Sequence, residues 1–303
     1  MSRRLLWGII ILLIATNIAT LIGFINYQSE GSIPLDVENK GKDLGKQVAI
    51  VGDSSIDRED WLQELVDAHG EKVLEQMIDR EVVSKLADHY ELKLNEKWID
   101  RELSHIENTI HTFDEKTVKE MRKELRENIK YRLYLEELLT KDIVVEEQRI
   151  KAYFDENGDQ LNFPKSYQLS HIVLDDDHEV QKVLAELEAG ASFSMLAREY
   201  SIDPFTKDKG GYLGYYAEGN VYLPQQYYDI LEQINHGEYS SPFKTEEGTV
   251  ILYLHRTLPE ITFTYDEVKH AIKRRLALEQ INVNQAKKYL WEEVGVEWIY
   301  EES

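Results

Sequence analysis

The chain has 303 residues, a mass of 35.5 kDa and a formal net charge of −22. This length allows two domains, or one domain with a large appendage. The acidity argues against nucleic acid as a partner, because phosphate binding needs a basic face. The absence of cysteine excludes disulfides, thiol nucleophiles and cysteine-ligated metal or iron–sulfur sites.

The chain begins with an apolar stretch. Residues 5–25 carry no charged side chain, and about 20 such residues span a bilayer. Two arginines precede the stretch, whereas the first lysine after it is Lys40. The positive-inside bias therefore predicts a cytoplasmic tip at 1–4, a membrane anchor over 5–27 and an extracytoplasmic location for the bulk of the chain. A cleaved signal peptide is the alternative, and the remainder is exported in either case.

Residues 28–46 mix glycine, serine and alternating charges, which is typical of a flexible linker. The β-prone run 47–51 follows. Apolar residues then recur at helical spacing, and no glycine or proline occurs from Glu71 to Asn157. We therefore expect a helical domain over 47–163.

Within this domain, capping residues predict where the helices begin and end. Asp57 is an expected N-cap, and Gly70 is the expected end of that first helix. Asn95 and Asp114 are expected to start two further helices, the second of them long. A short helix should end before Gly158.

Residues 164–258 have a different texture, with more glycine and two β-prone runs. Strands are expected at the two ends of this segment and helices between them, so it reads as a compact α+β domain. The expected elements are strands at 167–174 and 249–254 and helices at 178–189, 193–200 and 227–234.

The last segment, 259–303, has an amphipathic run at 265–291 and a β-prone run at 294–300. We expect the run at 265–291 to form one helix that packs on the helical domain and completes it. We expect 294–300 to be a strand that pairs with 47–51, because each otherwise lacks a partner for its backbone groups.

Common catalytic and metal-binding motifs are absent. The sequence contains no phosphate-binding glycine loop, no His-Glu-x-x-His pair and no Gly-x-Ser-x-Gly elbow. His105 and His111 are six residues apart, which is off-register for one helix face. We therefore expect neither a metal site nor a cofactor.

One ordered series of short motifs in the α+β segment is more specific. It begins with Ser-His-Ile on a predicted strand and ends with Thr-Glu-Glu-Gly before the last one. The motifs lie at 170–172, 190–197, 200–203, 210–216, 237–242 and 245–248. In this order they resemble the parvulin-type peptidyl-prolyl cis–trans isomerases, over about residues 166–257.

Together with the anchor, the helical segment and the C-terminal helix, the chain resembles the extracytoplasmic foldases of the PrsA and SurA kind, in particular the membrane-anchored Gram-positive type. The resemblance implies a small antiparallel sheet flanked by helices and inserted into a chaperone-like helical domain. It also implies isomerase activity on unfolded or nascent exported polypeptides that contain X-Pro bonds.

The resemblance also assigns site residues. His171 matches the histidine at the floor of the proline pocket, and Asp203 matches the Cys-or-Asp position beside it; these two are the expected catalytic residues. The expected substrate-binding residues are Leu213, Tyr216, Leu223, Tyr227, Thr245 and Val250. From the residues alone, His171 can also be a buried strand histidine, and Asp203 can cap a turn before Pro204.

Two departures from the family pattern leave the activity open. The second pocket histidine is expected at the position of Val250, and His255 lies five residues on, so it faces the other side of a strand. The usual aspartate of the Gly-rich loop is Tyr212. The alternative function is therefore a non-catalytic holdase with a degenerate parvulin domain.

Overall fold

The structure is a computed structural model and describes residues 46–110 and 115–300. The predicted anchor, 5–27, and nearly all of the predicted linker lie outside the described residues. Among the helices that are described, none is both long and apolar enough to cross a bilayer. The chain divides into two compact units at Gly70.

The first unit contains a local hairpin, with strand β1 (Gln47–Val51) antiparallel to β2 (Ser54–Asp57). Our expectation that 47–51 pairs with 294–300 is wrong, since the described residues after Val294 form no strand. The physical reason is local. Gly52 adopts φ +63°, which closes a tight turn, so β1 finds a partner three residues away without closing a long loop.

Helix α2 (Arg58–His89) begins directly after the hairpin and continues through Gly70, where we expected it to end. A glycine inside a helix costs only about 1 kcal/mol, which long flanking helical sequence can offset. The same holds for Gly158, which lies inside α5 (Glu147–Leu161) rather than after it. Between them, α3 (Glu96–Glu107) is capped by Asn95 as predicted, and α4 runs Glu115–Thr140.

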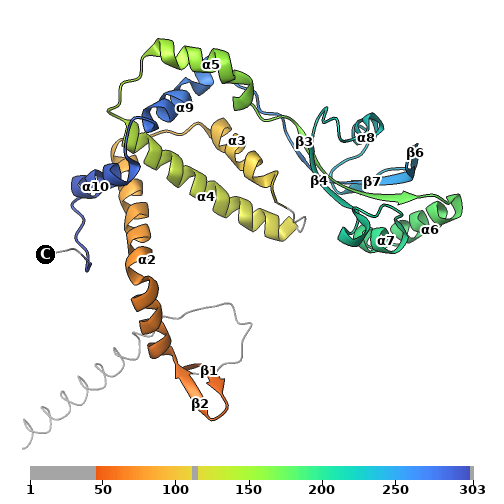
Figure 1. Cartoon of the computed structure of the whole chain (residues 1–303), viewed down its shortest axis with the longest axis horizontal. Coiled ribbons are helices and arrows are strands. Elements are labelled where there is room, and N and C mark those ends of the chain that lie inside the picture. The colour runs from red at the N-terminus through yellow and green to blue at the C-terminus, as the bar shows by residue number, and fades with distance from the viewer. Residues whose placement is uncertain (1–45, 111–114, 301–303) are drawn as a thin grey trace, which may run out of the picture. The chain divides into compact units, whose positions relative to one another are not determined.

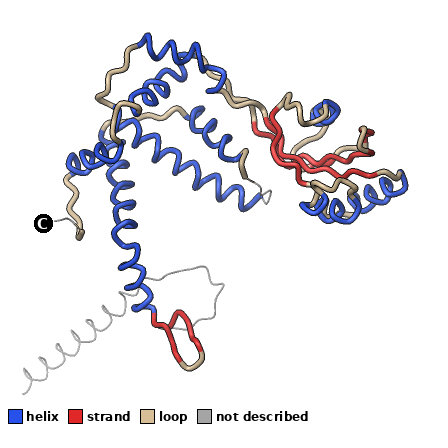
Figure 2. Tube along the Cα trace, viewed as in Figure 1, coloured by secondary structure: helices blue, strands red, loops and turns tan. Residues whose placement is uncertain are grey.

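The C-terminal run forms two helices, α9 (Tyr265–Leu278) and α10 (Val283–Val294), and not the single helix we expected. The second begins directly after Asn282, whose backbone carbonyl accepts the first helical hydrogen bond, from the N–H of Ala286. Figures 1 and 2 show α9 beside α5, and Val268, Ile272 and Leu276 bury their side chains against that helix. Leu290 of α10 joins the core of α2 and α4.

The α+β segment, 164–258, contains a sheet in the order β4-β3-β7-β5, and β6 pairs with the beginning of β7. All these pairs are antiparallel, which confirms the predicted class. The strands are β3 (Ser166–Leu174), β4 (Tyr212–Ala217), β5 (Glu238–Tyr239), β6 (Phe243–Thr245) and β7 (Gly248–Leu258).

Helices cover both faces of this sheet (Figure 1). One face buries a core with α6 (Asp177–Glu188) and α7 (Phe193–Tyr200). The other face buries a second core with α8 (Gln225–Leu231). The two ends of this segment lie side by side where they join the helical part, because Phe163 and Ile261 form an antiparallel bridge there. Odd-numbered residues of β3 face α8, and this alternation places the candidate site.

Candidate functional site

The site is built around His171, which lies in the middle of β3 with 4% of its surface exposed. Its backbone N–H donates to the carbonyl of Gly211 at 2.9 Å. Gly211 adopts φ +78°, and a Cβ there would lie 2.2 Å from the His171 carbonyl oxygen. Only glycine therefore allows the Gly-rich loop to approach β3 this closely, and the approach fixes the backbone that carries the imidazole.

Three side chains lie within hydrogen-bonding distance of the two ring nitrogens of His171. Nε2 lies 2.9 Å from Asp203 Oδ2 and 3.0 Å from Thr206 Oγ1. Thr206 also donates its hydroxyl to Asp203 Oδ2 in a very short hydrogen bond. On the other side of the ring, Nδ1 lies 2.8 Å from the hydroxyl of Tyr227. The predicted pair of His171 and Asp203 is thus in direct contact, and it is part of a cluster of four side chains.

Burial sets the protonation states of this cluster. It lowers the pKa of His171, and the adjacent Asp203 carboxylate opposes the change only in part. Burial alone would raise the pKa of Asp203, but hydrogen bonds from Thr206, His171 and the Phe205 backbone outweigh it and hold this pKa below its usual value. At neutral pH the imidazole is therefore neutral and the carboxylate is ionised.

These states assign the hydrogen positions. An ionised carboxylate only accepts hydrogen bonds, so the proton of His171 is on Nε2 and is donated to Asp203. Nδ1 is then an acceptor, and the Tyr227 hydroxyl donates to it. Burial raises the pKa of Tyr227, which keeps that hydroxyl protonated. The cluster holds one tautomer of a neutral histidine.

Asp203 also shapes its own loop, as the alternative interpretation expected. Its Oδ1 accepts from the backbone N–H of Phe205 at 3.0 Å, which closes a turn around Pro204. The same carboxylate therefore caps the turn with one oxygen and binds His171 with the other. Sequence reasoning missed Thr206, although its spacing of three residues from Asp203 across a proline turn is a usable signal.

The predicted pocket residues gather on the same face of the sheet as His171. Leu223 and Tyr227 are 5% and 3% exposed, and Leu213 and Tyr216 are half-buried against the same core. Leu213 and Tyr216 are three residues apart, yet they reach one core because β4 has a bulge, with Gly214 opposite Leu169 and Tyr212 opposite Ser170. An apolar and aromatic wall thus stands beside the polar cluster.

The last two predicted residues have different surroundings. Val250 is fully buried in this core, but it pairs with Val173, whereas Leu252 is the residue opposite His171. Thr245 does not join the cluster. Its hydroxyl donates to the Gly248 carbonyl and accepts from the Glu247 N–H, which holds the turn between β6 and β7.

The structure confirms the prediction that His255 faces away from His171. It lies on the opposite face, where its Nε2 is 2.7 Å from Ser170 Oγ, so it cannot reach His171. Tyr212 is on that face too, with its ring edge-on to His255. The hydrogen-bonding position next to His171 is filled instead by Tyr227, an aromatic residue that we predicted only as pocket wall.

Comparison with known proteins identifies the family of this chain. Residues 175–256 match the family model described as Rotamase, the PPIC-type PPIase domain. A Bacillus subtilis (strain 168) protein named putative peptidyl-prolyl cis-trans isomerase YacD is 36% identical over 261 residues, covering 85% of this chain and 87% of that protein. The foldase protein PrsA of Caldanaerobacter subterraneus subsp. tengcongensis is 31% identical, covering 74% and 70%.

Solved structures from two bacterial species are similar to this chain. The crystal structure of PrsA from Bacillus subtilis is 24% identical and covers 83% of this chain and 93% of its own, with a TM-score of 0.30. A SurA-like chaperone structure from Campylobacter jejuni is 22% identical and covers 84% and 100%, with a TM-score of 0.36.

Proposed function

Because the chain belongs to the parvulin-type peptidyl-prolyl cis–trans isomerases and is related to the PrsA foldases, we propose that it acts on X-Pro bonds and that the reaction takes place at the apolar wall beside the polar cluster around His171. The observation that carries this assignment is the buried, fully hydrogen-bonded cluster around His171, at the base of an apolar wall. Leu213, Tyr216 and Leu223 hold the prolyl ring on this account.

The reaction needs no covalent step. Rotation about an X-Pro bond must break amide resonance, a barrier of about 18–20 kcal/mol. The twisted amide has a less polar carbonyl than the planar one. An apolar wall that removes water from the bond therefore favours the twisted state over the ground state, and this difference lowers the barrier.

The polar cluster has a positioning role in this proposal. Both nitrogens of His171 are occupied by protein partners, so the ring is not free to exchange a proton with a substrate. The cluster instead fixes the ring between β3, α8 and the Asp203 turn, and these elements carry the wall. Tyr227 belongs to both the apolar wall and the polar cluster, since its ring forms part of the wall and its hydroxyl hydrogen-bonds to His171.

The activity can be measured on the chain from residue 47 onward with a short X-Pro peptide. Leu223→Ala should lower kcat/KM by about tenfold or more, because it opens the wall to water. Leu231→Ala is the matched control, since Leu231 is equally buried at the end of α8 and has no assigned contact with the prolyl ring. A wild-type rate equal to the uncatalysed one, together with suppression of client aggregation, would favour the holdase alternative.

We further propose that the chain is anchored by 5–27, with its N-terminus in the cytoplasm and its clients among unfolded exported polypeptides. The charge asymmetry around the apolar stretch supports this orientation. The lack of cysteine makes the test direct. A membrane-impermeant maleimide should label Ser32→Cys in intact cells and Ser2→Cys only after permeabilisation. Loss of 5–27 from the mature protein by mass would show cleavage instead.

A further inference from the structure

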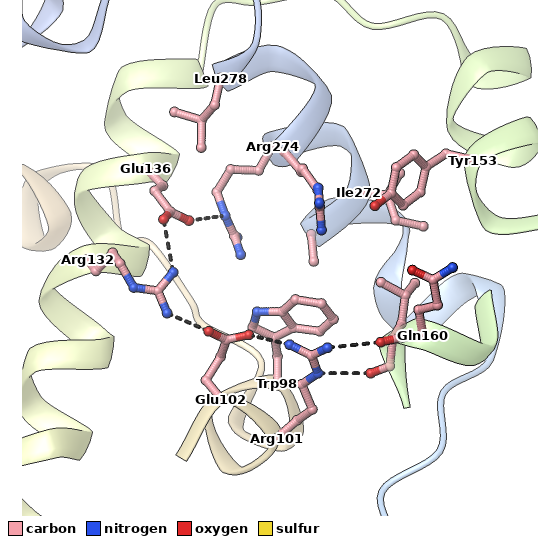
Figure 3. Close-up of a pocket in the computed structure, with 13 residues that line it drawn as sticks. Trp98, Arg101, Glu102, Arg132, Glu136, Tyr153, Gln160, Ile272, Arg274 and Leu278 are labelled. Atoms are coloured by element: carbon pink, nitrogen blue, oxygen red, sulfur yellow. Dashed lines mark hydrogen bonds and ion pairs between the residues drawn. The ribbon is translucent and has the colours of Figure 1, made fainter. Parts of the chain in front are cut away.

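A cavity lies in the helical part of the chain, outside the α+β segment that carries the proposed prolyl site. α3, α4, α5 and α9 surround a cavity of about 340 Å³ (Figure 3). Its walls include Trp98, Arg132, Tyr153, Gln160, Arg274 and Arg275. No lining residue comes from 164–258. The volume is at the lower end for ligand sites, which suits a side chain or a chain end.

Most of the charge around this cavity is already neutralised. Arg101 binds Glu102, Glu102 binds Arg132, and Arg132 binds Glu136, at 2.7, 2.6 and 3.0 Å (Figure 3). The series continues from Glu136 to Arg274, which is 8% exposed, and ends at Glu137. Three arginines alternate with three glutamates, so this network is neutral and has little capacity for another anion.

Arg275 is the exception. It lines the cavity, yet it takes part in no ion pair with a described residue. Its guanidinium carbon lies over the ring of Tyr153, 5.5 Å from the ring centroid. Neutral donors stand nearby. Within the described ranges, neither the indole N–H of Trp98 nor the side-chain amide of Gln160 has a hydrogen-bond partner, and Figure 3 shows the Trp98 ring across the middle of the cavity.

The rest of the wall is apolar, from Leu161, Ile272 and Leu278. One unpaired guanidinium, neutral N–H donors and an apolar wall together fit a carboxylate carried on an apolar peptide, because guanidinium binds carboxylate through two parallel hydrogen bonds. We propose that this cavity binds a carboxylate of an unfolded client polypeptide, with Arg275 as its charge partner. The client identity rests on the proposed function, but the binding itself does not require isomerase activity.

Calorimetric titration of the full chain with proline-free acetylated peptides tests the proposal separately from the prolyl site. The probes are acetyl-AALAA with a free carboxylate, acetyl-AALAA-amide and acetyl-AALEA-amide. At least one acidic peptide should bind about tenfold more tightly than the neutral amide, and added salt should reduce the difference. Which acidic peptide binds distinguishes a chain end from a side chain.

Arg275→Gln should abolish this preference, and its exposed position makes the substitution tolerable for folding. Arg149→Gln is the matched control, because Arg149 is an exposed arginine paired with Glu279 and does not line the cavity. Equal binding of neutral and acidic peptides, no binding of any peptide, or an unchanged preference in Arg275→Gln would overturn the proposal. Displacement by inorganic phosphate at matching concentration would indicate a general anion site and overturn it as well.

Discussion

Replacing Tyr227 with phenylalanine separates the two parts of the proposed site. The change keeps the aromatic wall and removes only the hydroxyl that donates to His171 Nδ1 at 2.8 Å. Tyr227 and His171 are 3% and 4% exposed, so water cannot easily replace the lost donor. The Nδ1 lone pair is then buried without a partner.

The size of the effect follows from that loss. A buried acceptor without a partner costs about 1–3 kcal/mol. We expect Tyr227→Phe to lower the free energy of unfolding by about that amount. If the freed ring also loosens the wall in the transition state, kcat/KM falls by about five- to a hundredfold. Isomerisation of an X-Pro peptide and urea denaturation of the same samples measure both quantities.

The neighbouring tyrosine is the control. Tyr228 is on the same helix and 9% exposed, and its hydroxyl donates to the Ala217 carbonyl at 2.8 Å, away from His171. Tyr228→Phe should therefore lower stability with little loss of kcat/KM. If Tyr227→Phe keeps kcat/KM within about twofold of the wild type, the cluster has no positioning role and desolvation by the wall is sufficient.

Two further predictions concern the backbone and the opposite face of the sheet. Gly211→Ala should unfold at a much lower urea concentration than the wild type, because the added Cβ would clash with the His171 carbonyl. Gly219 is the control, since it has a similar φ of +76° and open space around it. Gly219→Ala should lower the free energy of unfolding by only about 1–2 kcal/mol. Burial, with His236 adding to it, lowers the pKa of His255 from 6.5 to about 4. The unfolded chain therefore binds more protons between these values, and stability should fall by up to about 3 kcal/mol as pH drops from 6.5 to 4. In urea titrations across this range His255→Gln should show a flatter slope, and an unchanged slope would contradict the assignment.

Local patterns were sufficient for most elements of this chain. Apolar spacing identified the helices, and the ordered motifs identified the α+β segment, because each of these signals lies within a few neighbouring residues. The pairing of His171 with Asp203 came from the resemblance to the parvulin family, since no local signal joins residues 32 positions apart. The same reasoning failed where local signals were weak. Gly70 and Gly158 read as helix ends, but a single glycine is a small penalty inside a long helix.

The tertiary structure decided which groups complete the site. Tyr227 was predicted as wall, and no local pattern shows that its hydroxyl reaches an imidazole 56 residues away. Leu213 and Tyr216 face one core only because a bulge in β4 shifts the alternation. Hydrogen-bond partners and strand register depend on contacts between segments that are distant in the sequence. A local sequence pattern specifies which face of an element is apolar, but it does not specify those contacts.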